Sequence, residues 1–187
     1  MQKISLYLAL SLAVIGVMIG IVIGYSQTSD YKAQMYDKDG MDLGKADYFI
    51  DRRYLDAMIT HHQSAIKLAE QAAAESNRQE IKDLAEMIKE SEPKLIAELY
   101  EFKHEWYRDR RQAPAPTVPN LGEAGDTFDL RFLNALIAHH EEGIEMVAEI
   151  KTKTSRAAVI DNADAVGAFL SASKETLSEW REEWYNL

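Results

Sequence analysis

Apolar residues recur at helical spacing in four long segments of the chain, and a polar or proline-containing break separates each from the next. In the first segment, Leu55, Met58 and Ile66 share one face of the expected helix. The segments span about 47–75, 78–110, 127–152 and 156–185. The sequence contains no alternating pattern bounded by hairpin signals. We therefore expect an all-α protein in which four amphipathic helices pack as an antiparallel four-helix bundle.

The first 25 residues follow a different pattern. Between residues 4 and 23 the only polar side chains are two serines and one tyrosine, and about 20 such residues cross a bilayer as a helix. Because no clear small-x-small cleavage site follows, we expect residues 1–25 to be an uncleaved transmembrane anchor that contacts membrane lipid through residues 4–23. Lys3 before the segment and Asp30 after it favour an N-terminus inside and a C-terminal domain outside the cytoplasm.

Small residues mark one face of the expected anchor. Gly16, Gly20 and Gly24 lie at four-residue spacing, which allows a second helix to approach closely. A homodimer contact through these glycines is one interpretation, and the ordinary abundance of glycine in membrane helices is the other. The polar residues 26–46 that follow contain glycine breakers and are typical of a tether.

The remainder of the chain is an internal duplication. A shift of 78 residues aligns it with itself without a gap, so that Leu55 matches Leu133 and Trp106 matches Trp184. Each repeat supplies one helical hairpin, and the linker between the repeats holds three of the four prolines. The expected bundle, residues 47–187, thus comprises repeat one at 47–112, the linker at 113–125 and repeat two at 126–187.

Composition narrows the classes of function. A chain of 187 residues with 47% hydrophobic residues suits one domain plus an appendage. Its net charge of -10 excludes nucleic acid as an expected partner, because phosphate neutralisation requires clustered Lys and Arg. The absence of cysteine excludes disulfides and thiolate metal sites.

The histidines are the candidate functional residues. Four of the five form two adjacent pairs, His61-His62 and His139-His140, at equivalent positions of the two repeats. A helical wheel places His62 in the buried stripe and His61 about 100° round from it, at the stripe's edge. If a pseudo-twofold axis runs along the bundle, the first and third helices are parallel, and His62 is expected to face His140 across the core.

These positions allow two interpretations. Imidazole binds copper, zinc, iron and nickel, and a thioether adds a preference for Cu(I). The candidate ligands for such a metal ion are His61, His62, His139, His140, Met58 and Met146. The alternative is a structural or interaction bundle whose buried histidines serve packing or pH sensing. Spacing alone leaves both open. The paired Glu-x-x-His strings of a di-iron enzyme are incomplete, since Glu101-Phe-Lys-His104 is matched by Glu179-Trp-Arg-Glu182, and no catalysis is expected.

Two strings, YLDAMITHHQSAIKLA (54–69) and FLNALIAHHEEGIEMV (132–147), resemble the duplicated signature of the family called domain of unknown function 305. That signature reads aromatic-Leu-x-x-Met-x-x-His-His-x-x-Ala-x-x-Met-Ala. The resemblance covers about 47–187 and implies a ferritin-like bundle, exported or membrane-anchored in bacteria, with copper binding through Met and His in some members. Leu68 and Leu136 stand where the pattern has methionine.

From residues and resemblance together we expect a single-pass protein of the bacterial inner or plasma membrane with a periplasmic or extracellular bundle. It would bind a metal ion at a His/Met cluster for sequestration or transfer. Copper is the favoured metal, with zinc or iron as alternatives.

Overall fold

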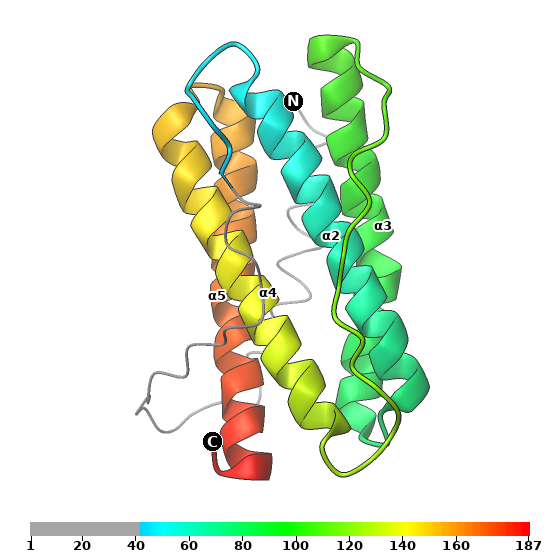
Figure 1. Cartoon of the computed structure of the whole chain (residues 1–187). Helices are drawn as coiled ribbons and strands as arrows, with labels where there is room; N and C mark the ends of the chain where they lie inside the picture. The colour runs from blue at the N-terminus through cyan, green and yellow to red at the C-terminus, as the bar shows by residue number, and fades with distance from the viewer. Residues whose placement is uncertain (1–41) are drawn as a thin grey trace.

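The computed structural model describes residues 42–187, within which the chain forms four α-helices and no strand (Figure 1). The helices are α2 (Ile50–Glu75), α3 (Gln79–Tyr107), α4 (Phe128–Lys153) and α5 (Ala157–Tyr185). The prediction of an all-α, four-helix protein is confirmed. The expected anchor and its glycine contact lie outside the described residues, and no helix within 42–187 is long and apolar enough to cross a membrane.

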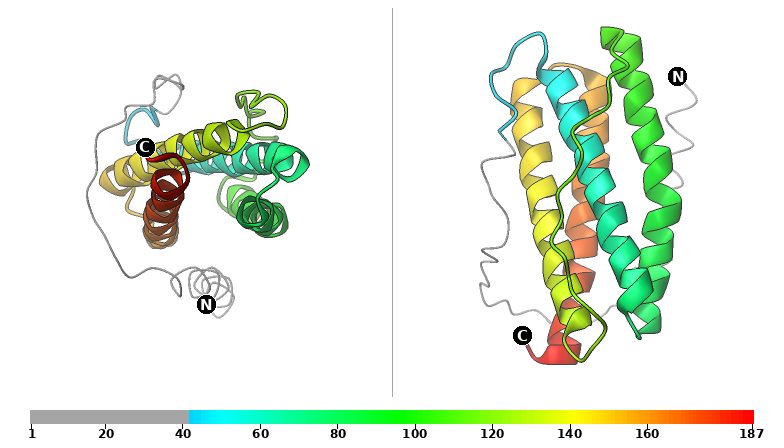
Figure 2. Two further views of the ribbon diagram at one scale, coloured as in Figure 1. Left: turned by 90° about the horizontal axis from the view of Figure 1, so that it is seen from below. Right: turned by 45° about the vertical axis from the view of Figure 1, so that its right-hand side comes forward.

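The helices form two hairpins, α2 with α3 and α4 with α5, which meet through α2 and α4. Figure 2 shows α2 and α4 in one layer, with α3 and α5 on the same side of that layer. The two central helices are antiparallel, because each begins where the other ends. Thr154 Oγ1, after α4, donates to Asp51 Oδ1 of α2 at 2.5 Å, and Ser76 Oγ, after α2, donates to Asp129 Oδ1 of α4 at 2.6 Å.

The predicted parallel arrangement of these two helices was wrong, and the linker gives the reason. Residues 108–127 return along α2 to the opposite end of the bundle before α4 begins (Figure 1). The proline carbonyls along this path accept hydrogen bonds from α2 side chains. Thr60 Oγ1 donates to Pro114 at 2.9 Å, and Gln71 Nε2 donates to Pro119 at 3.1 Å. The pseudo-twofold axis is therefore perpendicular to α2 and α4.

Two apolar clusters fill the interior, one toward each end of the α2–α4 contact. The first joins the second half of α2 to the first half of α4, and its largest members include Leu68, Phe128 and Phe132. The second joins the first half of α2 to the second half of α4 and includes Tyr54 and Met146. The histidine pairs lie between these clusters along both helices, so a polar layer divides the core.

The duplication extends further towards the N-terminus than the sequence suggested. Leu43-Gly44 is the structural equivalent of Leu121-Gly122, and both glycines have positive φ angles, 74° and 78°. Arg53 Nε donates to the Leu43 carbonyl at 2.6 Å, and Arg131 Nε donates to the Leu121 carbonyl at 2.5 Å. Residues 42–46, which the sequence assigns to the tether, thus pack on the bundle, and Leu43 is 3% exposed.

Alanine at either of these glycines is expected to lower the free energy of unfolding by about 1 kcal/mol, because left-handed backbone strains a residue that carries Cβ. Gly44→Ala and Gly122→Ala lie at opposite ends of the molecule, so their effects should add. Urea denaturation measures both. Gly125→Ala is the matched control, since its φ is not positive and its Cβ would meet no atom within 4 Å. Equal stability of Gly44→Ala and Gly125→Ala would contradict the strain argument.

Candidate metal site

The four paired histidines meet where α2 crosses α4, and all four are buried. The rings of His61 and His139 stack on each other with centroids 3.7 Å apart and planes within 9°. The prediction that His62 faces His140 was therefore wrong, because the pair that meets across the pseudo-twofold axis is His61 and His139. Because α2 and α4 are antiparallel, α2 contacts α4 through the face that carries His61, whereas His62 faces α3 within its own hairpin.

His62 and His140, which do not belong to the stacked pair, each have a partner on the second helix of their own hairpin. His62 Nδ1 contacts the carboxylate of Glu92 on α3, and Glu92 is 8% exposed. His140 Nε2 lies 2.9 Å from Ser173 Oγ of α5. The repeat equivalent of Glu92 is Leu170, so only the first hairpin places a carboxylate beside its histidine. The two halves of the site differ by one negative charge.

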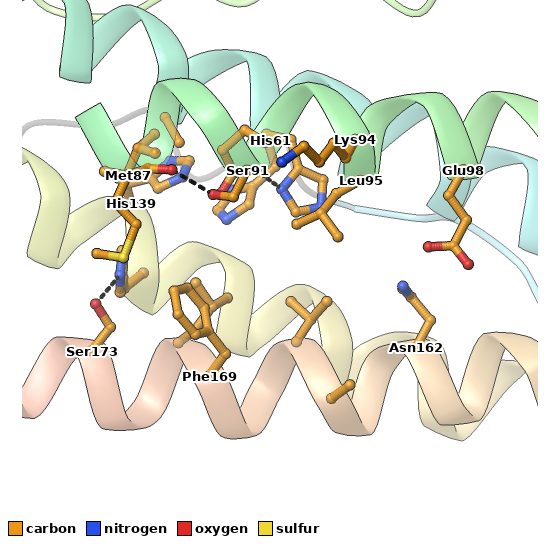
Figure 3. A pocket seen from close by; sticks show the side chains of 18 of the residues that line it. His61, Met87, Ser91, Lys94, Leu95, Glu98, His139, Asn162, Phe169 and Ser173 are labelled. Carbon is orange, nitrogen blue, oxygen red and sulfur yellow. Dashed lines mark hydrogen bonds and ion pairs between the residues drawn. The ribbon is translucent and has the colours of Figure 1, made fainter. Parts of the chain in front are cut away.

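These side chains form the floor of a groove between α3 and α5, with a volume of about 190 Å³. Its walls are mainly apolar and include Ile88, Phe102 and Val166. The thioether of Met87 also lines it. Figure 3 shows side chains entering from both sides: Met87, Ser91 and Leu95 from α3, and Asn162, Phe169 and Ser173 from α5.

A glycine on α4 makes room for His61. A Cβ added at Gly143 would lie 2.6 Å from His61 Nε2, so a side chain there would displace the ring. The same Nε2 atom is buried without a hydrogen-bond partner in the described structure. Because buried polar atoms are almost always paired, this nitrogen is a candidate ligand atom, as is His140 Nδ1, which is also buried without a hydrogen-bond partner.

Burial keeps the imidazoles of His61, His139 and His140 neutral. It lowers the pKa of His61 and of His139 well below the ordinary value of 6.5, and the neighbouring histidines lower both further. Burial also lowers the pKa of His140 to about 4, against the opposing effect of the Leu136 carbonyl. At neutral pH these three rings each retain a nitrogen lone pair, the form that binds a metal ion.

The two predicted thioether ligands lie elsewhere. Met58 and Met146 are buried in the core cluster that holds the start of α2, and neither lines the groove. Leu68 and Leu136, at the positions where the resemblance expects methionine, both belong to the opposite cluster. Antiparallel packing thus gathers both thioethers at one end of the α2–α4 contact and both leucines at the other.

The donors converge on the floor without forming a finished coordination sphere. Within residues 42–187, no three His, Asp or Glu side chains are arranged to hold one metal ion. Stacked rings present their faces rather than their nitrogens to each other, so a bound metal would require at least one imidazole to rotate. The donor types and the unpaired His61 Nε2 fit a metal ion, and the groove leaves space for the rotation.

Glu92 and Met87 were not among the predicted site residues, because neither belongs to the repeated histidine motif. Glu92 was visible as a charged residue in the apolar stripe that Ile88, Leu95 and Leu99 mark on α3. A buried carboxylate requires a partner, and that rule would have placed Glu92 opposite a basic side chain.

Comparisons with known proteins agree with this architecture. The model of the family described as domain of unknown function (DUF305) matches residues 51–120 and 116–181. No curated protein matches the chain. Among solved structures, CopM in its Cu(I)-bound form is similar with a TM-score of 0.64 and 28% identity, over 72% of this chain and 97% of CopM. The Ag-bound and apo forms of CopM each give a TM-score of 0.63 at the same identity, covering 72% of this chain and 97% and 98% of CopM.

Proposed function

The chain belongs to the DUF305 family, and from this premise we propose that it is a membrane-anchored, extracytoplasmic protein that binds Cu(I) on the histidine floor of the groove. Its role is sequestration or transfer of the ion without turnover. The observation that carries the proposal is the buried, unpaired His61 Nε2 among four buried imidazoles. Similarity to CopM, which has been solved with copper and with silver bound, supports the choice of metal.

The charges of the groove favour a monovalent ion. Moving an ion from water into an apolar site costs free energy that rises with the square of its charge, so a divalent ion is penalised about four times as much. The neutral imidazoles of His61 and His139 supply donors but no charge. Glu98 and Asp161 also line the groove but are more exposed, so Glu92 beside His62 is the one buried carboxylate of the lining. We infer that its charge is the one that offsets a bound Cu(I).

The donor atoms also favour Cu(I). Imidazole nitrogen and thioether sulfur together select copper over magnesium or calcium, and thioether favours Cu(I) in particular. Met87 is the thioether that lines the groove with the histidines. Met58 and Met146 lie in the core cluster at the start of α2 and do not line the groove.

Competition titration of the full chain in lipid nanodiscs against a chromophoric Cu(I) chelator tests the function. We expect one high-affinity Cu(I) site that Ag(I) also fills, and Zn(II) binding at least about a hundredfold weaker because of its charge and its harder character. Uptake of Cu(I) no greater than that of empty nanodiscs would refute the proposal.

Replacing the buried carboxylate separates charge from shape. Glu92→Gln keeps the size of the side chain next to His62 but removes its charge, and we expect Cu(I) affinity to fall about tenfold, given the strength of charge interactions in partly buried sites. The same titration measures this loss. Glu86→Gln, on the exposed face of α3, is the control and should bind as the wild type does. An unchanged affinity in Glu92→Gln would remove the charge-balance argument.

A further inference from the structure

The two ends of the bundle, related by the pseudo-twofold axis, carry opposite charge. One end consists of residues 44–53, 107–111 and 151–157 and is called the basic end. These segments hold nine Lys or Arg and three Asp, a net charge of +6, in a chain whose total is -10. Asp42, Glu149 and Asp164 lie beside them and pair with Lys151 and Lys153, which leaves +3 for the surface as a whole. The equivalent residues 73–79, 122–131 and 185–187 hold two Arg and four acidic residues, a net charge of -2.

The three segments of the basic end are joined in space (Figure 1). Arg156 Nε donates to Asp51 Oδ2 at 2.8 Å, which ties the α4–α5 turn to the start of α2. Tyr107 Oη donates to the Tyr48 carbonyl at 3.2 Å, which ties the end of α3 to the same region. The charges therefore belong to one continuous surface.

Aromatic side chains are exposed on the same surface. Tyr48 is 73% exposed and Phe49 is 47% exposed, and within residues 42–187 the only other large apolar residue exposed in this way is Leu187. Both rings pack edge-on or tilted against Tyr107, with centroids 5.7 and 6.2 Å away. The repeat equivalents of Tyr48 and Phe49 are Asp126 and Thr127. The second repeat thus shows that the hairpin fold does not require aromatic residues here.

Several cations of this surface have no internal partner. The side chains of Arg108 and Arg110 are exposed and form no ion pair within the described part of the chain. Guanidinium groups bind phosphate through paired hydrogen bonds, and exposed aromatic side chains are typical of the membrane–water interface. An arginine-rich surface with exposed aromatics matches the headgroup layer of an anionic bilayer.

We propose that the basic end docks on the anionic phospholipid surface of the membrane that holds the anchor. The inference relies on the proposed anchor but not on copper binding. Leu43 packs beside the end of α4, where its N–H donates to Glu149 Oε1 at 3.2 Å. Residues 26–41 connect this point to the expected anchor and span at most roughly 55 Å when extended. The basic end is therefore within reach of the headgroups, and the bundle stands upright on the membrane with its groove open sideways to solution.

Hydrogen–deuterium exchange of the full chain in nanodiscs tests the docking. One set of discs contains phosphatidylcholine alone, and the other contains phosphatidylcholine with phosphatidylglycerol. We expect amides of residues 44–53 and 107–111 to exchange about tenfold more slowly in the anionic discs, while residues 122–131 do not change. Equal exchange in both lipids, or equal protection of both ends, would overturn the proposal.

A variant built from the second repeat provides the mutational test. Tyr48→Asp, Phe49→Thr and Arg108→Asn together install the residues that the equivalent end carries, and we expect the lipid-dependent protection to disappear. Lys82→Gln with Lys89→Gln makes the same change in net charge elsewhere, at residues that do not line the groove, and should retain it. The copper titration of the same samples is expected to be unchanged in both variants, so loss of docking and loss of metal binding are read separately. Retained protection in the triple variant would also overturn the proposal.

Discussion

Replacing His61 and His139 together by phenylalanine is expected to lower the Cu(I) affinity of the chain at least about a hundredfold, since it removes both nitrogen donors at the centre of the floor. Phenylalanine preserves a ring at each position, so the stacked pair and the packing against Gly143 can persist. The loss would then reflect missing donors rather than a collapsed groove. The chelator competition titration in nanodiscs measures it.

The fifth histidine provides the control. His104 lies on α3 outside the groove lining, so His104→Phe should leave Cu(I) affinity unchanged. If the double variant binds Cu(I) as tightly as His104→Phe does, the donors are elsewhere in the chain and the floor is not the site.

Acidification is expected to destabilise the metal-free bundle between about pH 6.5 and pH 4. The pKa values of His61, His139 and His140 are lowered in the folded chain, so the unfolded chain takes up protons that the folded chain does not. Their stabilising effect is complete above pH 6.5 and is lost as the pH falls towards the folded pKa values. His140, with a pKa of about 4, accounts for about 3 kcal/mol of this loss at 1.36 kcal/mol per pKa unit.

Urea denaturation at a series of pH values from 7.5 to about 4 measures the effect. Carboxylates also titrate in this range, so the informative quantity is the difference between the wild type and His61→Phe/His139→Phe. The variant should lose less stability on acidification, because two of the neutral imidazoles are gone. Parallel pH curves for the two proteins would show that the inner pair is not the cause. The same acid sensitivity would serve a pH-sensing bundle, and the copper titration distinguishes that alternative.

The helices and their duplication could be predicted from the sequence because both depend on local pattern. Apolar spacing marks each helix, and a gapless offset places His61 and His139 at equivalent positions whatever the packing. The direction of α4 relative to α2 could not be read in this way, because it depends on the path of the linker along Thr60 and Gln71. A twenty-residue proline-rich connection is long enough to span the bundle, and that length was the available signal.

The orientation of the histidines was mispredicted for a related reason. A helical wheel shows one buried stripe and does not say which neighbouring helix each part of the stripe contacts. Helix α2 has two neighbours on different faces, α3 and α4. His62 faces the first and His61 the second, so both are buried although they point in different directions. The structure also accounts for the two positions where leucine replaces the expected methionine. Leu68 and Leu136 lie in one core cluster, whereas Met58 and Met146 lie together in the other.

Anomalous diffraction at the copper absorption edge, from crystals of the Cu(I)-loaded full chain, would locate the bound ion and so test whether the histidine floor holds it. We predict a peak at the floor of the groove between α3 and α5, at a metal–nitrogen bonding distance of about 2 Å from an imidazole nitrogen of His61 or His139. A copper peak bound only by residues outside the groove, with the His61–His139 stack intact, would contradict it.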